Sequence, residues 1–323
     1  MQHGLTIVVP VFNRASYLPR LVEAMLSSDH RPLSIVLVDN GSTDGSRQIC
    51  SDLAKHYSSQ DVDIRVIDEP RSGAPAARNT GLSICVTEYV YFFDTDDDFS
   101  THFVCRVMSE LESHTDIDML CCPVMMECNG HRFVRAHEPS ASVEAHILSS
   151  MLDTQSMVFR TTWLRSIGGW PSDVDIWQDW LLGLRALLHN PRLCWLPGSA
   201  SHVIHVHPNS ITGSDFSSRS VQSLATMRLA MDEVAADSGR EDIATLFLSL
   251  SLRAAIMSGH LLREGDVSGS QAYDVVTTDC LRAASAGVRG RWVRFVGRCL
   301  RLYTRHGGRG AWRLALWAVR IGQ

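Results

Sequence analysis

Four apolar runs of a length typical of buried strands recur through the first hundred residues. They cover residues 5–12, 33–39, 64–68 and 89–93, and segments whose apolar residues recur at helical spacing lie between them. Strands that are apolar almost throughout are covered on both faces, as in a parallel sheet between two layers of helices. The alternation therefore predicts βαβ units and an α/β fold.

The pattern changes beyond the fourth run. Residues 119–135 predict a β-hairpin around Asn129–Gly130, and a further strand, a short helix and a strong helix over residues 176–191 follow. Near the end of this part a last strand runs into a loop, and the apolar spacing is then helical to the end of the chain. We therefore expect two domains, residues 1–213 and residues 214–323.

Three of the predicted strands end in an aspartate. These residues are Asp39, Asp68 and Asp94. Because ligands of open parallel sheets lie beyond the carboxyl ends of the strands, the three carboxylates are candidate ligand-binding groups. Aspartate is also common in turns and at helix caps, so a single one of them carries little weight.

A dense acidic run begins directly after the apolar run 89–93. It contains Asp94, Asp96, Asp97 and Asp98 within five positions. Two like charges 4 Å apart repel by about 4 kcal/mol at an effective dielectric constant of about 20. A bound Mg²⁺ or Mn²⁺ would remove this repulsion, since both ions prefer carboxylate oxygens, and it would also bridge a diphosphate. The alternative is a helix N-terminal cluster, which accounts for one or two of the four acids.

Six short motifs in one order resemble the inverting glycosyltransferases of family 2. The resemblance covers residues 4–212, and the motifs are VVPVFNR, VDNGSTDGS, GAPAARNTG, FFDTDDD, SIGGW with WQDW, and HVHPNSIT. It implies the GT-A nucleotide-sugar-binding fold, with a mostly parallel central sheet flanked by helices. A C-terminal α-helical region follows that domain in this chain.

The resemblance implies a nucleoside pocket at the first strand ends. Asp39 would contact the nucleobase, and Pro10 and Phe12 would shape the pocket around it. Asp68 would lie near the base or the ribose. The donor implied is a nucleotide sugar, most simply a UDP-sugar.

The resemblance also implies a site for the diphosphate and a divalent cation, Mn²⁺ or Mg²⁺. Arg78 would lie close to the diphosphate or the sugar, Asp94 would face the ribose or the sugar, and Asp96 would hold the metal. His207, in a His-x-x-Ser element, would contact the diphosphate or the metal. Alternatives are a surface ion pair for Arg78 and a polar histidine on a half-exposed strand for His207. Asp97 is a second ligand or a helix cap, and Asp98 is solvated charge.

An inverting transfer needs a carboxylate that takes the proton of the acceptor hydroxyl. The resemblance assigns this role to Asp179, although Gln178 stands where the family often has a glutamate. Asp173 and Asp175 are competitors, and a carboxylate at a helix start is the structural alternative. The neighbouring tryptophans are equally suited to stack on sugars or to fill the core; they are Trp170, Trp177 and Trp180.

Charge is unevenly placed along the chain. The net charge is −5, yet residues 280–323 hold ten arginines and no acidic residue, so the rest carries −15. A helix beginning near Arg291 would place arginines beside an apolar face, which is the composition of an interfacial helix on an anionic membrane. That face would consist of Trp292, Val296, Cys299, Leu300 and Tyr303. A tail docked on the acidic body is the alternative, and a polynucleotide partner is not expected.

Nine scattered cysteines without CxxC spacing indicate a reducing compartment. No apolar run reaches 18 residues and the N-terminus lacks the features of a signal peptide, so we expect neither a membrane span nor a leader, and a cytoplasmic or peripheral location.

Together these features predict a metal-dependent inverting glycosyltransferase of the hexosyl or N-acetylhexosaminyl type. Its acceptor would be a hydroxyl of a glycan or a lipid-linked saccharide, in cell-surface polysaccharide or glycoconjugate synthesis. Two other functions remain open. One is a catalytically inactive, glycosyltransferase-like binding protein. The other is a phosphatase of the haloacid dehalogenase type, whose Asp-x-Asp motif also follows an apolar strand.

Overall fold

The computed structural model describes residues 2–28, 30–135, 142–200, 202–206, 215–237, 239–285 and 287–321. The chain forms two compact units. The first, here called the sheet unit, comprises residues 1–137, 152–173 and 189–207. The second, the helical unit, comprises residues 138–151, 174–188 and 208–323. Two segments before the sequence boundary near 214 therefore belong to the helical unit, because their helices pack on its other helices.

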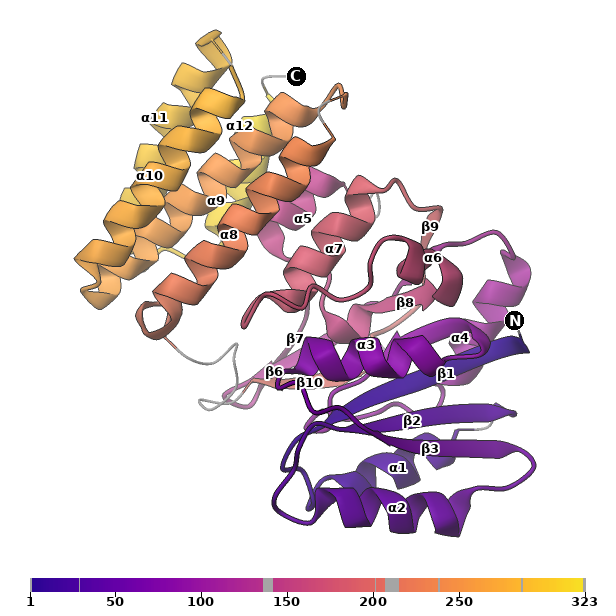
Figure 1. Ribbon diagram of the computed structural model, residues 1–323. Coiled ribbons are helices and arrows are strands. Elements are labelled where there is room, and N and C mark those ends of the chain that lie inside the picture. The colour runs from indigo at the N-terminus through magenta and orange to yellow at the C-terminus, as the bar shows by residue number, and fades with distance from the viewer. Residues whose placement is uncertain are drawn as a thin grey trace. The chain divides into compact units, whose positions relative to one another are not determined.

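The sheet unit is built on seven strands in the order β3-β2-β1-β4-β8-β5-β9 (Figure 1). The first four strands run parallel, β8 is antiparallel to both of its neighbours, and β5 and β9 are parallel. This confirms the predicted mostly parallel sheet. The strands are β1 (Gln2–Val11), β2 (Leu33–Asp39), β3 (Val62–Asp68), β4 (Thr87–Phe92), β5 (Met119–Cys121), β8 (Met157–Arg160) and β9 (Leu193–Trp195).

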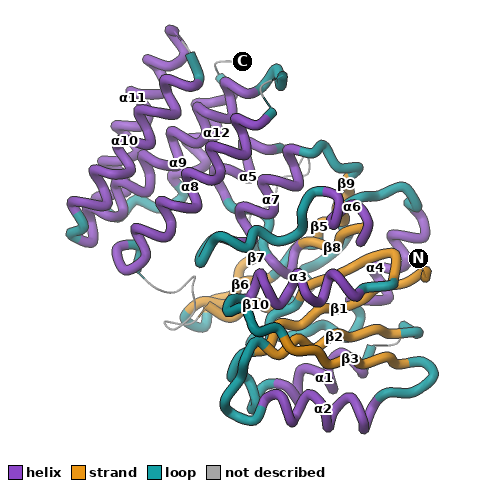
Figure 2. The backbone as a smooth tube through the Cα atoms, viewed as in Figure 1, coloured by secondary structure: helices purple, strands orange, loops and turns teal. Residues whose placement is uncertain are grey.

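Helices flank this sheet, as Figure 2 shows, and alternate residues of β1 serve its two faces. Ile7 and Val9 share one buried cluster with apolar residues of α1 and α4. Val8 points to the opposite face, where α3 approaches so closely that a Cβ on Gly81 would lie 2.3 Å from a methyl carbon of Val8. The helical elements of the unit are α1 (Leu18–Leu26), α2 (Ser46–Tyr57), α3 (Ala74–Ile84), α4 (Phe103–Ser113), η1 (Thr154–Ser156) and α6 (Thr161–Ser166).

A second, three-stranded sheet has the order β10-β6-β7, with β6 (Met125–Cys128), β7 (His131–Val134) and β10 (Val203–Val206). Asn129 and Gly130 both have positive φ, as the two central residues of a tight hairpin require. The predicted hairpin is therefore confirmed, but it is shorter than residues 119–135, because β5 leaves it to join the large sheet. β10 is the predicted last strand, and it pairs in parallel with β6.

The helical unit is arranged around α9, on which α5, α8, α10, α11 and α12 pack (Figure 1). By length and composition α9 could cross a membrane, but 83% of its most apolar stretch is buried inside the unit. It is therefore the core helix of this unit. The elements are α5 (Val143–Ser149), α7 (Gln178–Leu188), η2 (Ser217–Arg219), α8 (Ser220–Ala236), α9 (Ile243–Glu264), α10 (Val267–Ala283), α11 (Gly287–Arg305) and α12 (Ala311–Arg320).

The apolar face predicted for the tail helix lies mostly on the exposed side of α11. The buried face of α11 contains Val293, Leu300 and Thr304, and of the predicted residues only Leu300 belongs to it. α11 packs on α9 through small residues and not through its aromatic ones, since a Cβ on Gly259 of α9 would lie 2.0 Å from Oγ1 of Thr304. Trp292 and most of the other large apolar residues of α11 consequently stay partly or fully exposed.

Candidate active site

The strand ends meet at one edge of the sheet, as the parallel register requires. Asp39 pairs with Asp68 across β2 and β3, and Val11 of β1 pairs with Asp39 on its other side. Asp94 follows β4, the other neighbour of β1, by two residues. The three aspartates predicted from the strand ends therefore belong to one edge.

Asp39 is buried, with 5% of its surface exposed. Its Oδ2 accepts a hydrogen bond from the backbone N–H of Ser42 at 3.2 Å. Its Oδ1 is buried and has no hydrogen-bond donor among the residues that the structure describes. An unmatched buried acceptor costs about 1–3 kcal/mol, and more when it is charged. This oxygen is suited to accept an N–H from a bound ligand.

Two loops interlock around this carboxylate. Asn13 accepts the backbone N–H of Thr43 at 2.8 Å and donates its own to Oγ of Ser42 at 3.0 Å. The N–H of Arg14 donates to Oγ of Ser46 at 2.8 Å. These bonds fix the loop after β1 against the loop after β2. The second loop also holds Asp44, whose pKa is lowered by its hydrogen bonds to Ser46 and Ala15.

The residues predicted to shape the nucleobase pocket lie at the end of β1. Pro10 pairs with Val38 in the sheet, and Phe12 exposes 57% of its surface directly after the strand. Asp68 is exposed and forms an ion pair with Arg47 of α2, which raises the pKa of Arg47. Asp68 reaches the same edge as Asp39, but solvent and an arginine already surround its carboxylate.

Glu69, which the sequence did not single out, orders the loop after β3. Its buried carboxylate accepts hydrogen bonds from Arg71, at 2.7–3.0 Å, and from the hydroxyl of Thr80. These bonds, led by that from Arg71, lower the pKa of Glu69 to about 2. Asn40 joins the same loop by donating to the carbonyl of Glu69 and accepting the N–H of Gly73, both at 2.8 Å.

Arg78 is buried, which excludes the surface ion pair. Its Nη2 donates to Oδ1 of Asp94 at 2.6 Å, and its guanidinium carbon lies 4.3 Å from the ring centre of Trp170. Asn79 holds Trp170 by two backbone hydrogen bonds of 2.9 Å. Trp170 is almost fully buried and packs against Phe92, so it is a core residue rather than a sugar platform. Arg78 and Asp94, two of the predicted site residues, are therefore joined by a direct ion pair.

Asp96 is half-buried, and its Oδ2 lies 3.4 Å from Nη2 of Arg14. Asp97 accepts the N–H of His205 at 2.9 Å and the side-chain amide of Gln155. Burial, followed by the charge of Asp94, raises the pKa of Asp97 to about 9.

Asp98 is not the solvated bystander that the sequence suggested. It forms an ion pair with Arg20 and a 3.0 Å contact with Nε2 of His205, and its backbone bridges to Val203.

His202 is buried among four aromatic rings and accepts the N–H of Ser100 at 3.1 Å, and burial lowers its pKa to about 3. His202 is therefore a neutral core residue.

Asp96, Asp97 and Asp98 line a cavity of about 400 Å³ together with Tyr17 and Arg20 of the α1 region. Among the described residues no three His, Cys, Asp or Glu side chains are arranged to hold a metal. His207 and its His-x-x-Ser element lie outside the described residues. The chemistry of Asp96 still fits Mg²⁺ or Mn²⁺, since such ions often use one or two carboxylates and complete their shell with water and phosphate.

Asp179 lies in the helical unit, in the first turn of α7. It is half-buried, and its Oδ1 accepts the N–H of Trp180 at 2.8 Å. Trp180 is buried in the core, whereas Trp177 is partly exposed and has a positive φ of 57°. Asp175 is exposed in the loop before α7, and Asp173, also exposed, belongs to the sheet unit.

Three residues that position the site were not predicted from the sequence. They are Arg14, Glu69 and Gln155, and the sequence pattern marks them to different degrees. Arg14 stood inside the first motif, and only its contact with Asp96 was missing. Gln155 gave no pattern, because it contacts Asp97, which is distant in sequence. Glu69 contacts mainly its near neighbour Arg71, but neither residue stands in one of the six motifs.

The sequence profile described as "Glycosyl transferase family 2" matches residues 6–167 of this chain. Glycosyltransferase GlyG of Streptococcus pneumoniae is 38% identical over 98 residues, which are 30% of this chain and 31% of that protein. The pre-mycofactocin glycosyltransferase of Mycobacterium tuberculosis is 29% identical over 210 residues, 60% of this chain and 41% of that protein. The matched stretches thus span less than half of the length of these two relatives.

Two solved structures share the fold. Residues 1–349 of S. aureus TarS match with a TM-score of 0.71 at 18% identity, covering 100% of this chain and 92% of that chain. The same protein has been solved with UDP and with UDP-GlcNAc. The mannosyltransferase PcManGT of Pyrobaculum calidifontis, solved with GDP-Man and Mn²⁺, matches with a TM-score of 0.56 at 17% identity, covering 99% of this chain and 87% of that chain.

Proposed function

The chain belongs to glycosyl transferase family 2, and on that premise we propose that it transfers a sugar from a nucleotide donor to an acceptor hydroxyl with inversion. The observation that carries the proposal is the unmatched buried Oδ1 of Asp39 at the ligand-bearing edge of the sheet. Membership of the family removes the phosphatase alternative. An inactive binding protein remains the competing outcome, and the experiments below separate the two.

We propose a UDP-sugar as the donor. The uracil N3–H would donate to Oδ1 of Asp39, and Phe12, exposed beside it, would cover the face of the base. The interlocked loops around Asn13 support this assignment, because they hold Asp39 in place before a ligand arrives. The UDP complexes of the structural relative TarS are consistent with the same donor class.

We assign the diphosphate side to Arg78, Asp94 and Asp96. A divalent cation held by Asp96 would neutralise charge on the leaving diphosphate. Arg78 carries a positive charge at the same edge and is oriented by Asp94 and Trp170, so it needs little rearrangement to contact a phosphate or the sugar. In the helical unit, Asp179 would accept the proton of the acceptor hydroxyl as that oxygen attacks the anomeric carbon. We propose a glycan or lipid-linked saccharide as the acceptor.

The donor assignment is tested by calorimetric titration of UDP with Mn²⁺ into the full chain and its Asp39→Ala variant. Loss of a charged hydrogen bond of about 1.5–3 kcal/mol predicts a 10- to 100-fold weaker Kd. The control is Asp63→Ala, which removes an exposed carboxylate of β3 paired with Arg65. Equal affinity of the Asp39→Ala variant and the unmodified chain would contradict the proposal. UDP binding without any sugar transfer to an acceptor panel would favour the inactive binding protein.

We further propose that α11 and α12 bind an anionic membrane surface. Phe295 and Trp317 are 60% and 55% exposed, and both contact the ring of Trp292. Exposed arginines of α11 lie beside Phe295 on the same helix, one turn before it, next to it and one turn after it, at Arg291, Arg294 and Arg298. Aromatic rings beside arginines match the interface of an anionic bilayer. The proposal keeps the predicted partner and adds Phe295 and Trp317 to the predicted face, to which Trp292 belongs.

A further inference from the structure

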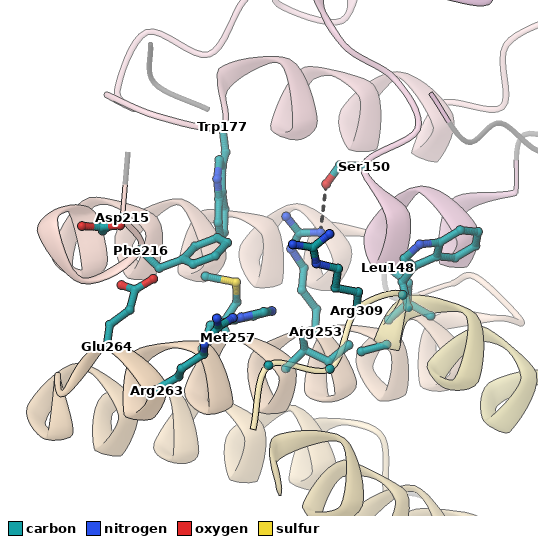
Figure 3. A pocket seen from close by; sticks show the side chains of 17 residues that line it. Leu148, Ser150, Trp177, Asp215, Phe216, Arg253, Met257, Arg263, Glu264 and Arg309 are labelled. Atoms are coloured by element: carbon teal, nitrogen blue, oxygen red, sulfur yellow. Dashed lines mark hydrogen bonds between the residues drawn. The ribbon is translucent and has the colours of Figure 1, made fainter. Parts of the chain in front are cut away.

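The helical unit contains a cavity of about 700 Å³ to which the proposed mechanism gives no role. Its walls come from α5, α9, the turn between α11 and α12, the residue before α7 and the segment before α8 (Figure 3). The labelled side chains in Figure 3 combine aromatic rings with several charged groups. A cavity of this size holds a sugar with a substituent.

Arg253 of α9 forms the floor of the cavity and is 9% exposed. Its Nη1 donates to the carbonyl of Ile147 at 2.8 Å and to Oγ of Ser150 at 3.0 Å. Its guanidinium carbon lies 4.7 and 4.3 Å from the ring centres of Trp177 and Trp180. Its Nε is buried without a hydrogen-bond partner among the described residues.

The charge of Arg253 is retained at neutral pH but is not neutralised by an ion pair. Burial lowers its pKa to about 10, and Asp179 is among the groups whose charge opposes that shift. No described carboxylate forms an ion pair with this guanidinium. A buried charge without a counter-charge is costly, so a bound anion would stabilise the cavity.

Two further arginines lie at the rim. Arg263 and Arg309 are exposed, line the cavity, and form no ion pair with a carboxylate in the part of the chain that the structure describes. Figure 3 shows the guanidinium groups of Arg253 and Arg309 pointing into the same part of the cavity, whereas Asp215 and Glu264 lie at the other end of the view. Arg263 lies at the same end of the view as Glu264, so Arg253 and Arg309 form the cationic part of the cavity, which favours an anion.

We propose that this cavity binds a phosphate ester on the acceptor, with a sugar ring of the acceptor against Trp177. Guanidinium groups match phosphate oxygens in charge and in geometry. Trp177 lines the cavity and precedes Asp179 of α7 by two residues. An acceptor whose hydroxyl contacts Asp179 would therefore have its neighbouring groups beside this cavity. The inference rests on the proposed function, because it assigns the cavity to the acceptor through the role of Asp179.

The test is a calorimetric titration of the full chain, saturated with UDP and Mn²⁺, with glucose 6-phosphate, glucose and glucuronate as probes. Glucose 6-phosphate is expected to bind at least 10-fold more tightly than glucose. Arg309→Ala and Arg253→Lys should each weaken its binding about 10-fold. Arg228→Ala, which changes an exposed arginine of α8 that does not line the cavity, is the matched control and should leave it unchanged.

Equal binding of glucose and glucose 6-phosphate would overturn the proposal, as would equal losses in the Arg309→Ala and Arg228→Ala variants. Tighter binding of glucuronate than of glucose 6-phosphate would overturn the choice of phosphate. The Asp39→Ala variant separates this inference from the donor assignment. It should lose UDP affinity and keep glucose 6-phosphate affinity, since the two sites belong to different units.

Discussion

The acidic edge of the sheet unit and the cationic cavity of the helical unit differ in whether their charged side chains form ion pairs. At the edge, Asp94, Asp96 and Asp98 each lie against an arginine of their own unit. In the cavity, Arg253 has carbonyl, hydroxyl and ring contacts but no described carboxylate. The edge is therefore largely neutralised before a ligand binds, whereas the cavity is left with net positive charge for a ligand to neutralise.

The two units therefore offer a ligand different kinds of unsatisfied group. The edge offers a carboxylate oxygen, Oδ1 of Asp39, which suits a directed hydrogen bond from a base. The cavity offers charge, which suits an anion and tolerates variation in the rest of the ligand. This division fits one well-defined donor and an acceptor recognised mainly by its charge.

The largest effect is expected from Asp179→Asn. Without a proton acceptor the rate of sugar transfer should fall by about 10²–10⁴-fold. UDP affinity should stay unchanged, because Asp179 lies in the helical unit and the donor groups lie in the sheet unit. Transfer is measured by release of UDP from the donor in the presence of acceptor. Asp175→Asn, which changes an exposed neighbour, is the control, and equal losses in both variants would remove Asp179 from the role of base.

Close helix contacts offer a test of how far the two units are independent. Gly259→Ala should destabilise the helical unit by about 1–3 kcal/mol, because the new Cβ would lie 2.4 Å from the carbonyl oxygen of Arg301. Gly297→Ala on the facing helix meets nothing closer than 3.5 Å and should stabilise by about 0.5–1 kcal/mol through helix propensity. Denaturant unfolding checks both. Loss of UDP affinity in the Gly259→Ala variant would show that the units are coupled.

A pH-dependent effect is expected at the edge of the sheet unit. The pKa of Glu69 is lowered to about 2, so its ionised form stabilises the folded state above its ordinary pKa of 4.5, and this contribution disappears as the pH falls towards 2. Glu69→Gln should therefore reduce stability by about 1–3 kcal/mol at pH 7. The difference from the unmodified chain should shrink between pH 5 and pH 2 in thermal unfolding curves. A difference that does not change with pH would exclude an electrostatic origin.

The smallest effect is expected at the surface of α11 and α12 that we propose binds a membrane. Replacing Phe295 and Trp317 by serine should reduce pelleting with vesicles containing anionic phosphatidylglycerol several-fold, since two exposed rings are lost. Vesicles of neutral phosphatidylcholine serve as the control. Unchanged pelleting would show that these two rings do not bind the membrane, and would leave α11 and α12 with the single role of packing on α9.

The sequence predicted the sheet well, because continuous apolar strands and strand-end aspartates follow from local pattern alone. It placed Asp39, Asp68 and Asp94 at one edge for the same reason. It could not show that Asp98 is paired with Arg20 and His205, since those contacts join residues distant in sequence. It also did not indicate which face of α11 is buried, because that face is set by the close approach of Gly259 of α9 to Thr304, and these two residues are distant in sequence.

The burial of α9 has a consequence for synthesis. The helices that cover it, α10, α11 and α12, come after it in the chain. At about 5–20 residues per second, the 56 residues from Gly265 to Arg320 take several seconds to be made. During that interval a helix long and apolar enough to span a bilayer has only its earlier neighbours for cover. The apolar surface of α9 that α10, α11 and α12 bury therefore has no cover in the nascent chain until those helices have been made.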